Sequence, residues 1–410
     1  MVSAVRHAIF RTAAVNIAML MATTITGILV ARSLGESGRG QFASIVAVQG
    51  IAYVVGEVGQ SVAVTFAVSR APGSAAQALA GSRRIMIPAS LLVTVLGCVG
   101  AFFHAGGDRA VFVAYLLALC SILVNALGGP ALYALQAWSI TAWNRVRLAQ
   151  PIVYLLSAAL LFATGRLTIV LASAAMLVSY AVSMGFAVVM ERRLRPPPAA
   201  DAALPVSLVG YGLKQAGSSI PEVLSGSIDR VLLLGLVGAP ALGQYAVAQS
   251  VVSAAGPMGT AVSAVVFPSL AADVSTAGVR RRRELRIFGG AGILTATALV
   301  LLGLVSGWAV PLLFGEVFRP AAPLVWLLAP TVLLRALLQV SGTILRGRGT
   351  PGLATISNVV CLVTTTTLLI VLSARFGLPG AAAATAIGQA AGLAVSVFLV
   401  TRRVTNAAIR

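Results

Sequence analysis

The chain has 410 residues, of which 59% are hydrophobic and only 10% are charged, and its mean hydropathy is +0.98. Soluble domains are about 45–50% apolar and about 25% charged, so this composition excludes a soluble globular protein and predicts that most of the chain lies in lipid. The net charge of +19 then reflects membrane topology rather than binding of nucleic acid, because most arginines fall in segments expected on one side of the membrane.

Many segments of the chain are long and apolar enough for transmembrane helices, each of which needs about 20 residues. The sequence predicts twelve, near residues 13–31, 41–63, 85–103, 111–138, 149–164, 168–190, 209–236, 244–268, 287–310, 322–344, 353–373 and 381–400. We therefore expect an all-α integral membrane protein. With both termini in the cytoplasm, these spans place most arginines on the cytoplasmic side, as the positive-inside rule requires.

A ten-residue stretch occurs twice in the chain. The first copy is LGESGRGQFA at 34–43, and the second is VGAPALGQYA at 237–246, an offset of 203 positions from 34 to 237. Glycine occupies the second and seventh positions of both copies. Because glycine permits positive φ and close backbone approach, each copy predicts a tight connection between two apolar segments. The alternative is a chance resemblance between two loops.

The same offset divides the chain into two similar halves. We expect a six-helix bundle over 1–191, a cytoplasmic linker over 192–206 with three consecutive prolines, and a second six-helix bundle over 207–410. Proline-rich linkers are extended and stiff. Six spans per half return the chain to the same side, so both halves enter the membrane in one orientation, which is a plan that transporters use.

Polar side chains occupy one face of each of the first two predicted helices. Asn16 lies on the first, and Gln49, Tyr53, Glu57 and Gln60 recur on the second at steps of three or four. A carboxylate isolated in lipid costs roughly 3 kcal/mol or more, so Glu57 must be hydrogen-bonded, hydrated or protonated. Asn16, Gln49, Tyr53 and Glu57 are candidate cavity residues, and a purely structural role is the alternative.

Two further patterns belong to the first half. Gly-Gly-Pro at 128–130 is expected to interrupt the fourth helix, because proline lacks the amide that a helix interior uses. The sequence NRVR at 144–147 is expected to form the next cytoplasmic loop, with Trp138 and Trp143 at the membrane interface.

The seventh predicted helix is the most polar of the second half. Pro221 should kink it. Its polar residues form one stripe at steps of three or four: Lys214, Ser218, Glu222, Ser225 and Asp229. On the tenth helix, Arg335 and Gln339 lie one turn apart. We expect these polar faces to line a central cavity between the halves. The alternative is a buried ion-pair network, such as Glu222–Lys214 or Asp229–Arg335, that only holds helices together.

Sequence motifs for catalysis are missing. Lys214 is the only lysine, so the chain has no phosphate-binding loop of the GxxxxGK[ST] type. His7 and His104 lie far apart, and the three cysteines fall in apolar segments without metal-binding spacing. We therefore expect no enzyme activity, no catalytic residues, no metal and no cofactor, and transport that uses an ion gradient or the gradient of the substrate.

Six stretches of the chain have the character of a known membrane-protein family: 31–43, 227–235, 243–248, 267–271, 313–315 and 327–330. Through these stretches the chain resembles the polysaccharide biosynthesis flippases of the multidrug/oligosaccharidyl-lipid/polysaccharide (MOP) exporter superfamily. The resemblance implies two six-helix bundles in a V, as in multidrug and toxin extrusion (MATE) transporters, that work by alternating access in the bacterial inner membrane. It implies a lipid-linked oligosaccharide as substrate, with a glycan polymerase or glycosyltransferases as further partners besides membrane lipids.

On this interpretation, Arg335 and Lys214 are candidates for contacting the diphosphate of the substrate, since an anion of this kind needs fixed positive charge. Asn16, Gln49, Glu57, Glu222 and Asp229 are candidates for binding sugar hydroxyls or a coupling ion. Three alternatives stay open: a MATE-type multidrug cation antiporter, a lipid II-type flippase, and a membrane scaffold of a glycan-assembly complex that transports nothing.

Overall fold

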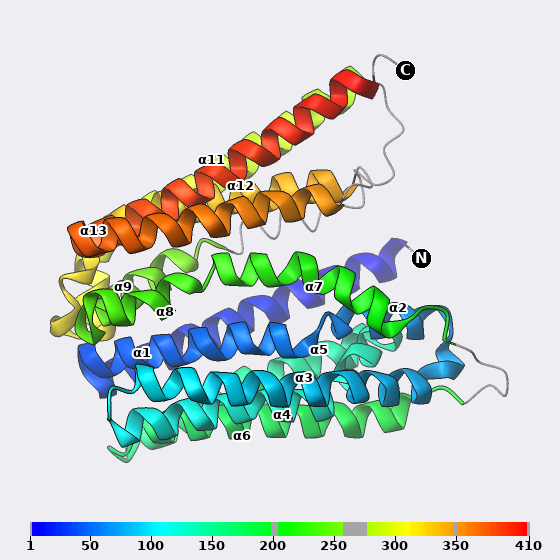
Figure 1. Cartoon of the computed structure of the whole chain (residues 1–410), viewed down its shortest axis with the longest axis horizontal. Helices are drawn as coiled ribbons and strands as arrows, with labels where there is room; N and C mark the ends of the chain where they lie inside the picture. The colour runs from blue at the N-terminus through cyan, green and yellow to red at the C-terminus, as the bar shows by residue number, and fades with distance from the viewer. Residues whose placement is uncertain (1, 198–203, 257–276, 348–350, 408–410) are drawn as a thin grey trace. The chain divides into compact units, whose positions relative to one another are not determined.

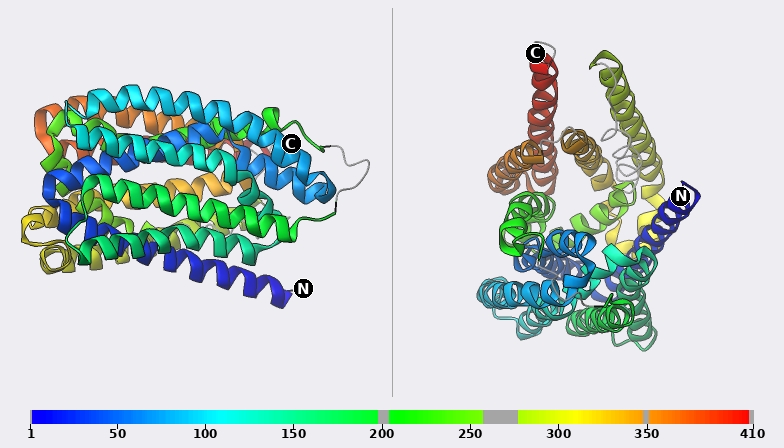
Figure 2. Two further views of the ribbon diagram at one scale, coloured as in Figure 1. Left: turned by 90° about the horizontal axis from the view of Figure 1, so that it is seen from below. Right: turned by 90° about the vertical axis from the view of Figure 1, so that its right-hand side faces the viewer.

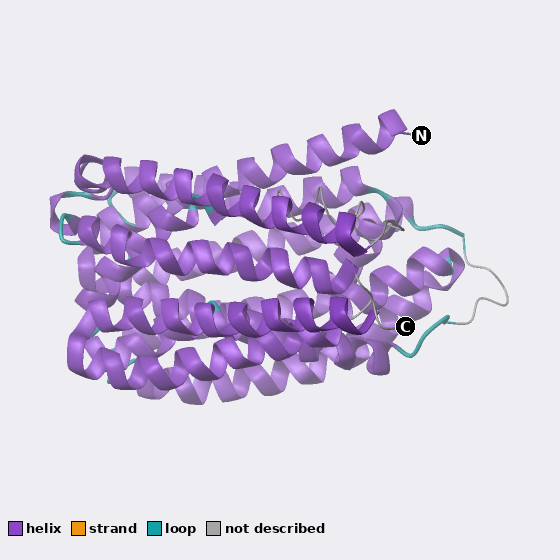
Figure 3. Cartoon of the chain, turned by 90° about the horizontal axis from the view of Figure 1, so that it is seen from above, coloured by secondary structure: helices purple, strands orange, loops and turns teal. Residues whose placement is uncertain are grey.

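The computed structural model describes residues 2–197, 204–256, 277–347 and 351–407. Every regular element in this part of the chain is helical (Figure 3), which confirms the predicted all-α class there. The α-helices in chain order are α1 (Val2–Glu57), α2 (Gln60–Arg70), α3 (Ala75–His104), α4 (Arg109–Trp138), α5 (Ile140–Ala163), α6 (Ile169–Leu194), α7 (Leu208–Ser225), α8 (Ile228–Val237), α9 (Ala239–Ser253), α11 (Ala277–Phe314), α12 (Ala321–Gly347) and α13 (Pro351–Ala407). Short 3₁₀ turns, η1 (Pro72–Ser74) and η2 (Glu316–Phe318), precede α3 and α12.

Eight helical segments among the described residues are long and apolar enough to cross a membrane. The protein is thus a multi-pass membrane protein. Two of the eight contain a non-helical glycine at which two helices join, Gly35 in α1 and Gly377 in α13. The number of twelve spans and their division into two bundles stay predictions, and the predicted span 244–268 and linker 192–206 lie partly outside the described residues.

The chain folds into two compact units. Unit 1 consists of residues 1–34 and 44–223, and unit 2 of residues 35–43 and 224–410. In unit 1, α4 packs against α3 and α6, and these long helices run side by side (Figures 1 and 2). In unit 2, α12 packs against α9, α11 and α13. The boundaries expected at 191 and 207 stay predictions.

The glycine at the second position of the repeated stretch has a positive φ angle in both copies. Gly35 has φ +65° and Gly238 has φ +84°. Their ψ angles are −170° and +168°, and this combination of positive φ with ψ near 180° costs residues other than glycine roughly 1–3 kcal/mol, so glycine is the residue that suits both positions. Gly35 interrupts α1, and Gly238 separates α8 from α9. The predicted use of glycine for positive φ is confirmed in both copies.

The glycine at the seventh position of each copy permits close backbone approach within unit 2. A Cβ atom on Gly40 would lie 2.8 Å from the Gly243 nitrogen and 2.9 Å from the Ala239 carbonyl carbon. A Cβ atom on Gly243 would lie 2.8 Å from the Glu36 carbonyl carbon. Because Glu36 and Ala239 hold the same place in the two copies, the contact is reciprocal. The duplicated sequences therefore pack on each other through their glycine faces.

The expected interruption of the fourth helix at 128–130 is absent, and two other predicted helices are broken where no interruption was expected. α4 runs without a break through Pro130, because Gly128 and Gly129 fit closely among neighbouring side chains and this packing supports the helix. The seventh predicted helix is broken at 226–227, between α7 and α8, whereas Pro221 lies inside α7. The second predicted helix ends before Val58 and Gly59, which have φ +52° and +67°, so Gln60 begins a separate helix.

Candidate functional site

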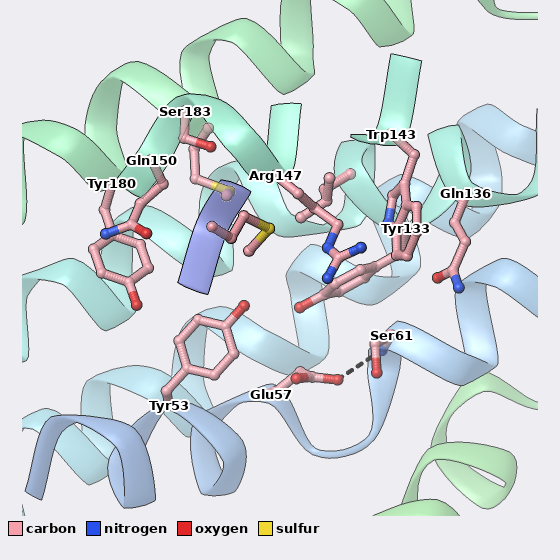
Figure 4. A pocket seen from close by; sticks show the side chains of 13 residues that line it. Tyr53, Glu57, Ser61, Tyr133, Gln136, Trp143, Arg147, Gln150, Tyr180 and Ser183 are labelled. Carbon is pink, nitrogen blue, oxygen red and sulfur yellow. Dashed lines mark hydrogen bonds between the residues drawn. The ribbon is translucent and has the colours of Figure 1, made fainter. Parts of the chain in front are cut away.

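Unit 1 contains a cavity of about 310 Å³ at the meeting of five helices. The side chains that line it come from α1, α2, α4, α5 and α6, and many are aromatic or polar (Figure 4): Tyr53, Glu57, Ser61, Tyr133, Gln136, Trp143, Arg147, Gln150, Tyr180 and Ser183. Met19, Leu132 and Met184 complete the lining. Ligand sites in proteins have this character, with apolar and aromatic walls and a few convergent polar groups. The cavity is therefore the candidate functional site.

The break between α1 and α2 fixes the position of Glu57. The positive φ angles of Val58 and Gly59 turn the chain, and the Ser61 amide then donates to Glu57 Oε1 over 2.9 Å. This amide belongs to the first turn of α2, where amides have no partner within the helix. A carboxylate at a helix N-terminus is stabilised by the helix dipole. The Glu57 carboxylate thus caps α2 while its side chain also borders the cavity (Figure 4).

The guanidinium group of Arg147 is held in a fixed orientation. It lies over the Trp143 ring, with 4.2 Å between the guanidinium carbon and the ring centroid. Its Nη2 donates to Asn16 Oδ1 over 3.1 Å. Trp143 is one turn earlier on α5, so the stacking requires only the helical spacing of the two residues. A cation–π contact of this kind contributes roughly 0.5–2 kcal/mol.

Hydrogen bonds behind the lining fix other side chains of the cavity. Tyr53 donates to Asn125 Oδ1 over 3.1 Å. Gln150 donates to the Ser179 hydroxyl over 3.2 Å, and Ser183 donates to the Val146 carbonyl over 2.9 Å. In Figure 4, the hydroxyl groups of Tyr53 and Tyr133 and the guanidinium group of Arg147 point into the same space. The site is therefore built on helices that hydrogen-bond to one another.

Sequence reasoning found part of this cavity and missed part of it. Tyr53 and Glu57 line it, and Asn16 binds the Arg147 that lines it. The expectation of a cytoplasmic loop at 144–147 is wrong, because α5 begins at Ile140 and includes these residues. The two arginines of the polar run at 144–147 led to the prediction of a loop. In the structure, Arg147 packs on the Trp143 ring, and the helix continues through the run. A helical spacing of Trp143, Arg147 and Gln150 was the signal that would have revealed the site.

Gln49 and the residues predicted on α7 lie away from this cavity lining. Gln49 is 4% exposed and donates to the Ser121 hydroxyl over 3.1 Å, which joins α1 to α4. Lys214 is exposed, and Ser218 and Glu222 are half-buried on α7. The expected role of these residues in substrate binding stays a prediction.

Asp229 forms a separate buried cluster in unit 2. The carboxylate accepts hydrogen bonds from the Tyr245 hydroxyl (2.8 Å), from Gln249 Nε2 (3.3 Å) and from the backbone amide of Arg230 (2.8 Å). The nearest ion-pair partner is Arg230, whose Nε lies 3.9 Å away, rather than the Arg335 considered from sequence. Three donors satisfy the buried carboxylate, and they hold α8 against α9.

Arg335 and Gln339 are half-buried one turn apart on α12. The guanidinium group of Arg335 lies against Gly226, where a Cβ atom would be 2.5 Å from Nη2 and 2.8 Å from Nη1. Arg230 also reaches this segment, because its Nη2 donates to the Gly226 carbonyl (3.2 Å) and to the Ser227 hydroxyl (3.1 Å). The break between α7 and α8 therefore accommodates two arginines within unit 2.

The fold is shared with solved membrane transporters. An inward-facing MATE-family multidrug resistance transporter of the MOP superfamily aligns with a TM-score of 0.72 and 14% identity over 95% of both chains. The lipid II flippase MurJ in an inward closed conformation aligns with a TM-score of 0.71 and 14% identity, over 95% of this chain and 87% of that one. The fold therefore defines a multi-pass membrane protein with the architecture of MOP-superfamily transporters.

A family model described as polysaccharide biosynthesis protein matches residues 5–272, which is more than half of the chain. The chain therefore belongs to the polysaccharide biosynthesis protein family, and the resemblance noted in the sequence is confirmed. The teichuronic acid biosynthesis protein TuaB of Bacillus subtilis (strain 168) is 29% identical over 145 residues. That alignment spans 35% of this chain and 30% of the curated relative.

Proposed function

We propose that the protein is a flippase that moves a lipid-linked oligosaccharide or polysaccharide precursor across the bacterial inner membrane. Membership of the polysaccharide biosynthesis family and the fold of MOP-superfamily transporters support this function. The observation that carries it is the polar and aromatic cavity inside an otherwise apolar membrane unit. Polar side chains are costly in a membrane interior, and their presence at such depth marks a path for a polar substrate.

The substrate is an amphiphile with a glycan head and a lipid tail. The glycan enters the wet part of the protein, while the tail stays in the bilayer against lipid-facing residues such as Leu92, Leu96 and Phe102, which are 60%, 61% and 67% exposed. Hydroxyl and amide groups of Tyr53, Gln136 and Gln150 exchange hydrogen bonds with sugar hydroxyl groups, which replaces hydration lost on entry.

Transport proceeds by alternating access of two six-helix bundles, over 1–191 and 207–410, joined by the linker at 192–206. Both termini lie in the cytoplasm, which agrees with the concentration of arginine on the segments assigned to that side. Lys214 and Arg335 bind the diphosphate of the lipid carrier as it crosses. A glycan polymerase or glycosyltransferases act on the substrate before and after the protein does.

Transport assays with the full chain in proteoliposomes test this function. We expect a fluorescent lipid-linked oligosaccharide to become accessible on the opposite leaflet at a rate that depends on the protein. The second compound tested in the assay is the dye R6G. A multidrug transporter in complex with R6G shares the fold, with a TM-score of 0.67. Dye transport without lipid-oligosaccharide transport would overturn the proposal in favour of a multidrug antiporter.

A matched pair of arginines gives the control for the cavity. Arg147 lines it, whereas Arg145, two residues earlier on α5, is exposed. Arg147→Gln is expected to slow transport by at least tenfold, and Arg145→Gln to leave it unchanged. Equal rates for the two variants would exclude the unit 1 cavity from the transport path.

A further inference from the structure

Arg147 is a membrane-helix cation without an anionic partner in the described part of the chain. Its hydrogen bond goes to the amide oxygen of Asn16, which is neutral. Other arginines among the described residues do form ion pairs with carboxylates, for example Arg195, Arg230 and Arg319. Arginine presents five N–H donors in a planar fork, and one bond to Asn16 leaves most of them available. A half-buried cation in this state favours an anion as the missing partner.

The other charge on the cavity wall does not fill this role. Glu57 and Arg147 both line the cavity, but they form no ion pair within 4.0 Å. The Glu57 carboxylate instead accepts the Ser61 amide at the start of α2, where the helix dipole favours its negative charge. Figure 4 shows the Glu57 carboxylate beside Ser61, with the dashed hydrogen bond between them, and the guanidinium group of Arg147 on another part of the lining.

Trp143 prepares the guanidinium group for a planar ligand. The guanidinium carbon lies 4.2 Å from the centroid of the Trp143 ring, and in Figure 4 the N–H edge of the group extends into the cavity. A carboxylate binds such an edge through two parallel N–H···O bonds, and this geometry is specific to arginine. Because the stack fixes the plane before the ligand arrives, less side-chain entropy is lost on binding.

The cavity carries too few positive charges for a highly charged ligand. Among the described lining residues, Arg147 is the one cation, and the Glu57 carboxylate is engaged by the Ser61 amide. A diphosphate would bring at least two negative charges beside Glu57 against one cation, and like charges at close range are unfavourable. A carboxylate brings one. The aromatic rings of Tyr53, Tyr133 and Tyr180 suit the body of a sugar better than a small phosphate, since ligand pockets combine apolar walls with few polar anchors.

We infer that the unit 1 cavity is a binding site for an acidic sugar, with Arg147 pairing with the carboxylate of a hexuronic acid unit and Trp143 orienting the guanidinium group. This inference rests on the proposed function and names the class of glycan that the protein carries. The acidic unit docks beside Arg147, which is not among the residues proposed to bind the diphosphate of the lipid carrier.

Binding of soluble probes to the full-length protein in nanodiscs tests the inference. The probes are a hexuronic acid disaccharide, the neutral hexose disaccharide of the same linkage, and inorganic pyrophosphate. We expect the acidic disaccharide to bind at least tenfold more tightly than the neutral one. Arg147→Gln should abolish this preference, Arg147→Lys should retain part of it, and Arg145→Gln should retain all of it.

The outcomes separate this inference from the proposed function. Equal affinity of the wild-type protein for the acidic and neutral disaccharides would overturn the acidic-sugar assignment, yet a neutral glycan would still be a substrate for a flippase. Competition by pyrophosphate in preference to the acidic disaccharide would overturn it in favour of a diphosphate site. The comparison between ligands uses the wild-type protein, so it tests the acidic-sugar assignment even where Arg147→Gln does not fold.

Discussion

The reciprocal glycine contact in unit 2 predicts that alanine at either position destabilises the protein. In Gly243→Ala, the new Cβ atom would lie 2.8 Å from the carbonyl carbon of Glu36. In Gly40→Ala, it would lie 2.8 Å from the Gly243 nitrogen and 2.9 Å from the Ala239 carbonyl carbon. Carbon atoms at optimal contact are about 3.5–4.0 Å apart. The neighbours are backbone atoms, so no side-chain rotation relieves the overlap and the two segments must separate.

The magnitude follows from the cost of inserting a methyl group into a packed contact, which is about 1–3 kcal/mol. For domains of 150–250 residues, each 1 kcal/mol lowers the midpoint of thermal unfolding by roughly 2–4 °C. We therefore expect each variant to lose about 2–12 °C. The measurement is the fraction of detergent-solubilised protein that stays monodisperse in size-exclusion chromatography after heating.

The control for this prediction is Gly50→Ala. Gly50 lies in α1, and a Cβ atom there would meet no atom within 4 Å. Alanine in a helix is favoured over glycine by roughly 0.5–1 kcal/mol, so this variant should match or exceed the wild-type midpoint. Wild-type midpoints for both Gly40→Ala and Gly243→Ala would refute the close packing of the two copies.

Three further substitutions test local parts of the structure. Gly35→Ala forces an L-residue to φ +65° and ψ −170° and should cost about 1–3 kcal/mol of unfolding free energy, measured by the same thermal assay. Tyr245→Phe removes a 2.8 Å donor from the buried Asp229 and should lower stability by about 1–3 kcal/mol, and an unchanged midpoint would contradict a structural role for this bond. Gln60→Leu removes the hydrogen bond to the Leu208 carbonyl (3.1 Å), but it also removes a buried amide oxygen that has no hydrogen-bond partner. The loss of unfolding free energy should therefore be smaller for Gln60→Leu than for Tyr245→Phe when the two variants are measured side by side.

Local patterns were sufficient to predict the class of structure. The excess of apolar residues requires lipid as the solvent, and in lipid the backbone must satisfy its own hydrogen bonds, which favours helices. Glycine at matching places of the repeat identified where positive φ and close approach occur, and the structure confirms this at Gly35 and Gly238. These properties depend on composition and backbone sterics, which are local and therefore visible in sequence.

Helical periodicity also identified polar faces, but it could not assign their partners. The stripe with Tyr53 and Glu57 was predicted, and both residues line the cavity. The same reasoning gave Asp229 and Arg335 as a possible ion pair, whereas the structure gives Asp229 a tyrosine, a glutamine and a backbone amide. Periodicity reports the direction of a side chain around its own helix and carries no information on what lies opposite.

What the sequence by itself determined is a membrane-embedded, all-helical chain with an internal repeat and the family to which it belongs. Only the tertiary structure decided that α5 continues through Arg147 and presents this cation to a cavity beside Trp143. Sequence rules assign arginine to the aqueous side of a membrane because an isolated charge is costly in lipid. Part of this cost is offset here by Asn16, which comes from another helix, and such a neighbour is brought close by folding alone.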